Sequence, residues 1–292
     1  VRYRDRLYVL NCYYGATAYP YRIAASSPVS AGAITWSTSG APTSTTGGIL
    51  DVDYGEEITG GREMWDRLWI FTEFRMWCYD QSQWKHLYDV GCSNHRTIQS
   101  SGQYMIWANG DGVWRSAGGG QPENIGGPVI DFIKKGTPRN FFATVVDEEY
   151  RLYVGTVTVN GMTYTNCELP FNIPTNTWRT REYANNMTAY ARYNNSGVMQ
   201  QYMGATSGEV FAKGKHTDST LISYDGASTV AIHSNFELAP VWLGSMNLEK
   251  RIKQITAIAD RAQGVKLSAR VVDRNLSVLT PYKPLGQLVK YV

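Results

Sequence analysis

One short strand recurs in this chain in nearly the same letters, at residues 5–9 (DRLYV), 66–70 (DRLWI) and 150–154 (YRLYV). Weaker copies stand at residues 103–107 (QYMIW) and 201–204 (QYMG). A recurring strand indicates a repeated sheet unit, and most of the spacings bracket the roughly 40 to 50 residues of a four-stranded propeller blade. Strand-like letters can also recur by chance in any all-β protein, so both interpretations stay open.

The composition favours the first interpretation. The chain has 292 residues with 20 Tyr, 9 Trp and 8 Phe, which suit pleated, half-buried surfaces, and 28 Gly, which suit turns. We predict an all-β fold: a β-propeller of roughly five to seven short antiparallel blades over residues 1–240. Residues 241–292 would form a basic β-hairpin extension that closes the propeller or contacts neighbours.

Several turns support this prediction. Asn160-Gly161 lies between alternating segments and is the strongest hairpin signal in the chain. A second hairpin is predicted around residues 109–112 (NGDG), with positive backbone angles at both glycines. Residues 64–71 and 75–79 are interpreted as the two strands of a third hairpin, and Asp225-Gly226 as a further turn.

The C-terminal region is basic and harder to interpret. Residues 248–262 could place Leu248, Ile252, Ile255 and Ile258 on one helix face, but strand-like residues 265–272 follow directly, so we predict a strand. From residue 241 onward the balance of charged residues is strongly positive, although the whole chain carries only +3. Such an end suits nucleic acid or an acidic partner surface, and equally an ordinary solvated face.

The sequence gives few signs of a membrane or an oxidising compartment. No apolar run approaches the roughly 20 residues that cross a bilayer, and the first residues lead into no signal-peptide core. Cys12, Cys78, Cys92 and Cys167 lie far apart, without the spacing of a zinc or redox site. We predict reduced thiols in a protein assembled in a cytoplasm. The chain begins without Met, so a processed or missing N-terminal part is an open alternative.

An ordered set of segments resembles a known family. The set runs through residues 48–52 (GILDV), 57–61 (EITGG), 65–71 (WDRLWIF), 91–93 (GCS) and 109–114 (NGDGVW), preceded by residues 21–26 (YRIAAS) and 33–36 (AITW). In this order they resemble the β-propeller structural proteins of tailed bacteriophages, which form the tail hub or nozzle of short-tailed phages. The resemblance covers residues 5–135 well and the rest loosely. The hydrophilic residues 81–86 and the absence of a large insertion domain depart from it, so the place in a virion stays open.

Motifs of catalysis and ligand binding are sparse. No Gly-x-Ser-x-Gly elbow, phosphate loop or His-Glu-x-x-His is present, and the four histidines are scattered. Carboxylates that a propeller glycosidase could use are Asp51, Asp53, Glu56, Glu57, Asp147, Glu148 and Glu149. In turns, carboxylates mostly cap or solvate the backbone. Asp51 and Asp53, or Asp111 with Asn109, could hold calcium, but no full ligand set is present. We predict no enzyme activity, metal or cofactor.

Six tryptophans could instead serve sugar binding. Trp65, Trp69, Trp77, Trp84, Trp107 and Trp114 stand in the strand segments, where burial between blades is the simpler explanation. The sequence and its resemblance together predict a structural component of a tailed-phage virion, part of a tail hub, nozzle or neck ring that continues the DNA channel. Expected partners are copies of itself, neighbouring tail, neck or portal-adaptor proteins, and passing DNA, with assembly in the host cytoplasm and no membrane.

The alternatives are a carbohydrate- or receptor-binding propeller and, less favoured, a propeller glycosidase. Partner or DNA contacts are predicted at six basic residues of the C-terminal region, with subunit or acidic-partner contacts preferred, because DNA must slide freely through a channel. These residues are Lys250, Arg251, Lys253, Lys266, Arg270 and Arg274.

Overall fold

The computed structural model describes residues 1–14, 16–52, 55–79, 84–195 and 198–213, and the backbone of the short segments 234–235, 266–269 and 283–287. The chain divides into two compact units, Val1–Glu237 and Leu238–Val292. The described part is predominantly β, which confirms the predicted all-β class. No helix in that part is long and apolar enough to cross a membrane.

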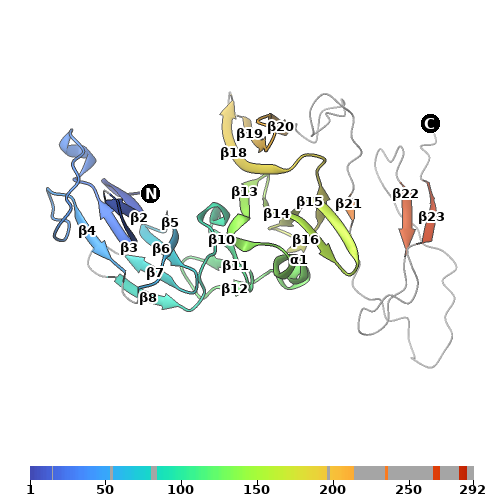
Figure 1. Cartoon of the computed structure of the whole chain (residues 1–292), viewed down its shortest axis with the longest axis horizontal. Coiled ribbons are helices and arrows are strands. Elements are labelled where there is room, and N and C mark those ends of the chain that lie inside the picture. Colours follow the sequence, from blue (N-terminus) through green and yellow to red (C-terminus); the bar gives the residue numbers. More distant parts are fainter. Residues whose placement is uncertain are drawn as a thin grey trace. The chain divides into compact units, whose positions relative to one another are not determined.

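Five antiparallel sheets follow one another along the first unit (Figure 1). Sheet 1 contains β1 (Arg2–Tyr3), β2 (Arg6–Tyr14), β3 (Thr17–Ala25) and β4 (Gly48–Asp51). Sheet 2 contains β5 (Ile58–Met64), β6 (Arg67–Thr72), β7 (Met76–Tyr79) and β8 (Trp84–Tyr88). Sheet 3 contains β9 (Gln99–Ser101), β10 (Tyr104–Asn109), β11 (Gly112–Ala117) and β12 (Glu123–Asn124).

Sheets 4 and 5 complete this unit. Sheet 4 contains β13 (Phe142–Val146), β14 (Glu149–Val159), β15 (Met162–Asn172), β16 (Thr177–Trp178), β17 (Thr180–Glu182) and β21 (Ser234–Asn235). Sheet 5 contains β18 (Met187–Asn195), β19 (Val198–Ala205) and β20 (Val210–Lys213). The helical segments are η1 (Val29–Ala31), η2 (His95–Thr97), η3 (Gly127–Val129), α1 (Ile130–Lys135) and η4 (Pro138–Asn140).

The recurring strand motif occupies the same place in every sheet. Its five copies lie in β2, β6, β10, β14 and β19, each the second strand of its sheet along the chain. Tight turns precede several copies, with left-handed residues at Trp65 and Asp66 (φ 55° and 54°) and at Asp147 and Glu148 (φ 52° and 61°). The prediction of one strand over residues 64–71 is therefore wrong, because the turn at Trp65 and Asp66 separates β5 from β6.

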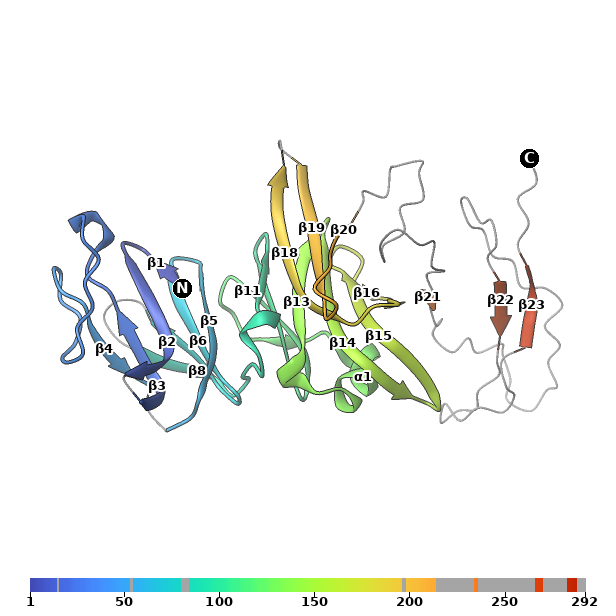
Figure 2. The same ribbon diagram turned by 45° about the horizontal axis from the view of Figure 1, so that its top comes forward.

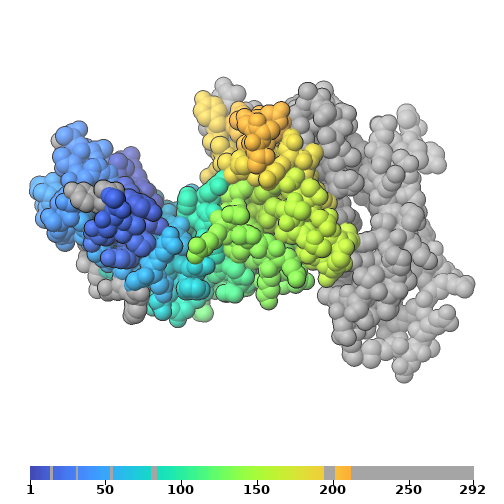
Figure 3. All heavy atoms as spheres, in the orientation of Figure 1, coloured from blue at the N-terminus to red at the C-terminus, as the bar shows by residue number. Residues whose placement is uncertain are grey.

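Successive sheets stack face to face, and the two-residue period of a strand explains how. On β6, Leu68 and Ile70 pack against sheet 1, whereas Trp69 and Phe71 pack against sheet 3. All four are fully buried. A strand whose sheet lies between two other sheets is apolar on both faces, and the recurring motif supplies these apolar residues. In the space-filling view, which is coloured by residue number, the successive sheets of the first unit lie next to one another (Figure 3).

Each of the four interfaces between neighbouring sheets has its own buried cluster. Interface 1–2 contains Tyr3, Tyr8, Ile23, Leu68, Ile70 and Trp77. Interface 2–3 contains Met64, Trp69, Phe71, Met76, Cys92, Met105 and Trp107. Interface 3–4 contains Ile106, Val113, Ile133, Phe141, Tyr150, Leu152 and Leu169. Interface 4–5 contains Phe142, Tyr153, Tyr183, Met187, Met203 and Phe211. Three of the six tryptophans of the strand segments, Trp69, Trp77 and Trp107, are buried as predicted.

Side chains also link successive sheets by hydrogen bonds to the backbone of a neighbouring sheet's first strand. Asn11 Nδ2 donates to Ile58 O of β5 over 3.2 Å. Gln99 Nε2 of β9 donates to Ala143 O of β13 over 2.9 Å. Figure 2 shows β13 with β18 beside it, and Arg192 of β18 donates to β13 in the same way. The bonds of Gln99 and Arg192 join neighbouring first strands of sheets 3, 4 and 5, whereas Asn11 lies on β2, the second strand of sheet 1.

The hairpin predictions can be checked one by one. Asn160 and Gly161 form the expected turn, with φ of 52° and 75°. The hairpin around residues 109–112 is confirmed as β10 and β11, but only Gly112 of its two glycines has a positive φ. β6 and β7 pair as predicted. The turn at Asp225-Gly226 and the strand at residues 248–262 lie outside the described residues.

The second unit is described only at two strands. β22 (Lys266–Ala269) falls within the predicted strand 265–272 and pairs antiparallel with β23 (Lys283–Gln287). Among the described residues of the first unit, no strand pairing joins sheet 1 to sheet 5. A closed propeller of five to seven blades therefore stays a prediction.

Candidate functional site

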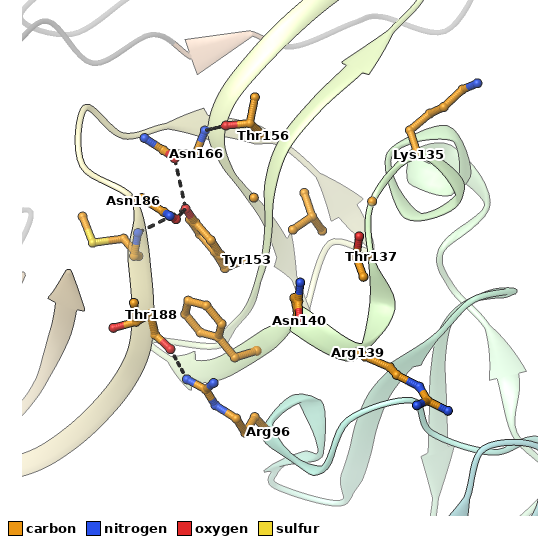
Figure 4. A pocket seen from close by; sticks show the side chains of 15 residues that line it. Arg96, Lys135, Thr137, Arg139, Asn140, Tyr153, Thr156, Asn166, Asn186 and Thr188 are labelled. Carbon is orange, nitrogen blue, oxygen red and sulfur yellow. Dashed lines mark hydrogen bonds between the residues drawn. The ribbon is translucent and has the colours of Figure 1, made fainter. Parts of the chain in front are cut away.

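A polar hollow of about 520 Å³ lies over interface 4–5. Its walls come from η2, the segment from α1 to η4, and strands β13, β14, β15 and β18 (Figure 4). The lining residues are Arg96, Lys135, Gly136, Thr137, Arg139, Asn140, Phe142, Tyr153, Val154, Gly155, Thr156, Asn166, Asn186, Met187 and Thr188. This lining is rich in amides, hydroxyls and cations and contains no carboxylate, histidine or thiol.

A local irregularity of sheet 4 shapes the hollow. The β14–β15 pairing shifts on both sides of Gly155, which has a φ of 79° and pairs with Cys167, and the adjacent Asn166 has a φ of 50°. Bulges of this kind redirect side chains and are frequent beside binding sites. At this bulge, Gly155 and the residues on either side of it form part of the wall of the hollow.

Tyr153 organises the floor of the hollow. Its hydroxyl lies 2.8 Å from Asn186 Oδ1 and 3.3 Å from Asn166 Oδ1, and it accepts the backbone N–H of Met187 over 3.1 Å. Burial is the main cause that raises the pKa of Tyr153 to about 12. The hydroxyl is therefore protonated at neutral pH and positions the two amides instead of acting as a base.

The amide of Asn166 is held by both of its ends. Its Nδ2 donates to Tyr183 O over 3.0 Å and to Ala184 O over 3.2 Å. Figure 4 shows Tyr153, Asn166 and Asn186 turned toward one another, while Lys135 and Arg139 point away from them. The centre of the hollow is thus a fixed hydrogen-bonding surface with cations at its margin.

The marginal cations are partly engaged. Arg139 Nη2 lies 3.0 Å from Glu73 Oε2, and the Arg139 side chain is largely open to solvent whereas that of Glu73 is partly buried. Arg96 donates to the backbone oxygen of Thr188 and lies over the Phe142 ring, 4.8 Å from its centre. A polar or anionic small molecule suits these walls, and no carboxylate, histidine or thiol is among the described residues of the lining.

A smaller hollow of about 380 Å³ shares Thr137 and Arg139 with the first. It includes Asn109 and Asp111, which the sequence offered as calcium ligands. Asn109 Oδ1 instead accepts the Trp114 indole N–H and the Asp111 backbone N–H, both over 2.9 Å. Among the described residues, no three His, Cys, Asp or Glu side chains gather as a metal site.

A buried polar network lies within interface 4–5. Glu168, which has no exposed surface, accepts from Arg181 Nη1 over 2.8 Å and from the Tyr190 hydroxyl. Arg151 donates to Gln201 across the interface. Burial is the main cause that raises the pKa of Tyr190 well above its usual value, so its hydroxyl is a donor to Glu168.

The carboxylates predicted from the sequence lie elsewhere and apart. Asp147 and Glu148 form the turn before β14. Glu149 is buried and paired with Arg151 at 3.0 Å and with Arg179. Asp51 pairs with Arg22 at 2.8 Å, Glu56 pairs with Arg75, and Glu57 accepts from Asn11. Asp53 is outside the described residues.

The sequence prediction missed Glu168 and Arg181, although a signal for Glu168 exists. Counting outward from the Asn160-Gly161 turn places Glu168 opposite Tyr153, on the same face of sheet 4 as Arg151. Of the six predicted basic contact residues, Lys266 begins β22 opposite Gln287, and the other five lie outside the described residues. All four cysteines are free thiols, and Cys78, Cys92 and Cys167 are buried.

A scan against protein-family models finds no match. A search of curated proteins finds none either. Functional inference therefore depends on the residues and their geometry.

Proposed function

We propose that this chain is a non-catalytic structural protein of a tailed-phage virion, whose stacked sheets are blades of a propeller within a tail hub, nozzle or neck ring. The observation that carries the proposal is the recurring motif at the second strand of five consecutive, face-to-face sheets. Repetition of one sheet unit, with linked first strands in sheets 2 to 5, is a pattern that blades around an axis have. The phage context comes from the ordered segments between residues 21 and 114.

The outer faces of sheets 1 and 5 support assembly with further copies. On sheet 1, Val9 and Ala24 pair, and Ala24 pairs with Ile49 in an apolar row across three strands. On sheet 5, the register aligns Ala189, Gly204 and Val210 in the same way. Val9 is 48% exposed and Val210 is 69% exposed. These uncharged rows resemble the sheet faces that are buried between successive sheets. Head-to-tail contact between copies of the chain would cover them.

Electron microscopy and light scattering test the proposal. We expect the purified protein to form rings of defined mass, and cryo-electron microscopy of virions to place it around the DNA channel. Val210→Glu should reduce the mass to that of a monomer, because it places a charge on the outer face of sheet 5. Phe74→Glu, at an exposed aromatic outside both end faces, is the matched control. A wild-type protein that stays monomeric at micromolar concentration contradicts the proposal.

The polar hollow favours a second candidate, a carbohydrate- or receptor-binding propeller. Its amides and hydroxyls, presented around Tyr153, are the groups that bind sugar hydroxyls. A monomeric protein that binds defined glycans on an array, and loses binding in Asn186→Ala, would favour this role over the structural one. The glycosidase is the least favoured, since the buried Glu149 and Glu168 are paired with arginines.

A further inference from the structure

Two arginines reach across neighbouring first strands from opposite sides. Arg62 of β5 donates through Nη1 to Ile98 O over 3.3 Å and through Nη2 to Ser100 Oγ over 2.8 Å. Arg192 of β18 donates through Nη1 to Val145 O of β13 over 2.8 Å. One arginine therefore belongs to sheet 2 and the other to sheet 5.

The two arginines bond to neighbouring strands, Arg62 to β9 and Arg192 to β13. Gln99 of β9 donates to Ala143 O of β13, so these strands lie beside each other. Ser100 adjoins Gln99, and Val145 is two residues from Ala143, about 7 Å along a strand. Burial lowers the pKa of Arg62, and the charge of Arg192 lowers it further. The two cations thus flank the same short stretch of β9 and β13 within electrostatic range.

Neither cation is neutralised by an ion pair. Among the described residues, no carboxylate oxygen lies within 4.0 Å of the Arg62 or Arg192 guanidinium. Among the described residues, Glu63 is the one acidic group that raises the pKa of Arg62, and its effect is the smallest of the causes. A guanidinium has five N–H donors, whereas the bonds here occupy two on Arg62 and one on Arg192.

Two guanidinium groups that repel each other and have further N–H donors favour the binding of a compact anion. We propose that Arg62 and Arg192 together bind a dianionic phosphate group, assisted by the Ser100 hydroxyl at the first-strand edge of sheets 2 to 5. Guanidinium forks match phosphate oxygens in geometry and charge. Ser100 Oγ accepts from Arg62, which leaves its O–H able to donate to the same phosphate. The anion relieves the repulsion between the two arginines.

A third arginine adds to the positive electrostatic potential but is not part of the proposed site. Arg96 bridges η2 to Thr188 of β18 and lies over the Phe142 ring of β13, on the same edge. Its charge adds positive potential along this edge. The site is independent of the proposed structural role, since it needs neither a ring nor a virion.

Calorimetric titration with orthophosphate at constant ionic strength tests the site. We expect saturable 1:1 binding to the full chain, weakened at least tenfold in Arg192→Gln and in Arg62→Gln. Arg67→Gln, at an exposed arginine of β6, is the matched control and should bind as the wild type does. Arg192→Lys, which keeps the charge but loses the fork, should fall between. The exposed position of Arg192 makes its variants the deciding ones if Arg62→Gln fails to fold.

A second ligand distinguishes the source of the phosphate. A single-stranded oligodeoxynucleotide carries only monoanionic phosphodiesters, so it should bind more weakly than a phosphomonoester such as phosphoserine. Oligonucleotide binding stronger than phosphomonoester binding, with the same loss in Arg192→Gln, would overturn the assignment to a dianion. Absence of saturable phosphate binding, or equal binding by Arg192→Gln and wild type, would overturn the site itself.

Discussion

Interfaces 2–3 and 4–5 perform the same structural task with different chemistry. Interface 2–3 is apolar, with Trp69, Phe71 and Trp107 fully buried and the Trp107 indole N–H donating to Gly91 O over 3.0 Å. Interface 4–5 instead contains the fully buried Glu168 in a hydrogen-bonded pair with the half-buried Arg181. Stacking of sheets therefore accepts either chemistry, and the charged groups of interface 4–5 are paired although Gln201 Nε2 has no hydrogen-bond partner among the described residues.

The difference has consequences for how each interface responds to change. An apolar interface loses stability in proportion to the volume removed, because the surrounding side chains relax only partially. A paired network responds to loss of either partner, since the remaining charge stays buried. Three substitutions compare the two interfaces directly.

The largest effect is expected at interface 2–3. Trp107→Ala removes a fully buried ring that contacts Phe71, with centroids 5.2 Å apart. It should lower the free energy of unfolding by about 4 kcal/mol, as large-to-small changes in cores do. Urea denaturation measures this, with Trp36→Ala, at a 45% exposed site, as the control expected to change little. Similar losses in both variants would mean that interface 2–3 is not a tightly packed core.

A smaller loss is expected at interface 4–5. Glu168→Gln removes the charge that pairs with Arg181 and should cost about 3 kcal/mol in unfolding free energy. The double variant Glu168→Leu with Arg181→Met should cost less than the sum of its two single variants, because it leaves no unpaired charge. Additive losses in this double-mutant cycle would show that the two side chains act independently and would remove the contrast between the interfaces.

The smallest effect concerns alkaline pH. Tyr153 has a folded pKa of about 12, above the value near 10 expected in the unfolded chain, because burial disfavours its anion. Its stabilising contribution is therefore complete below pH 10 and is lost as the pH rises from 10 to 12. Tyr153→Phe should flatten this loss by about 1–2 kcal/mol, allowing for partial solvent screening. Tyr13→Phe, at an exposed site, should leave the pH profile unchanged.

The sequence anticipated the sheets better than the polar site. The Arg-Leu-aromatic motif and the Asn160-Gly161 turn depend on neighbouring residues, so local patterns identify them. The carboxylates chosen as glycosidase candidates stood together in sequence, yet Asp147 and Glu148 form a turn and only Glu149 enters the interface. Glu168 required counting strand register from the turn. The approach of Arg62 to Arg192 depends on the stacking of four sheets, which no local pattern reports.

The recurring arginine shows the same limit at a single position. Arg6 and Arg151 occupy equivalent places in their strands, but Arg6 donates to Ser26 O and Thr46 O in a loop, whereas Arg151 pairs with buried Glu149. Equivalent residues of the repeat thus have equivalent backbone positions, whereas the surrounding residues determine which contacts each side chain makes.

The meander connection of each sheet bears on how the chain acquires its structure. Sheets 1, 2, 3 and 5 pair only strands that follow one another along the chain, and sheet 4 departs from this at β17 and β21. Apart from residues 26–47 between β3 and β4, the loops within these four sheets are short and cost little chain entropy to close, so each sheet can form from its own segment. The stack can then grow one sheet at a time as the chain emerges during synthesis, each new sheet docking on the last.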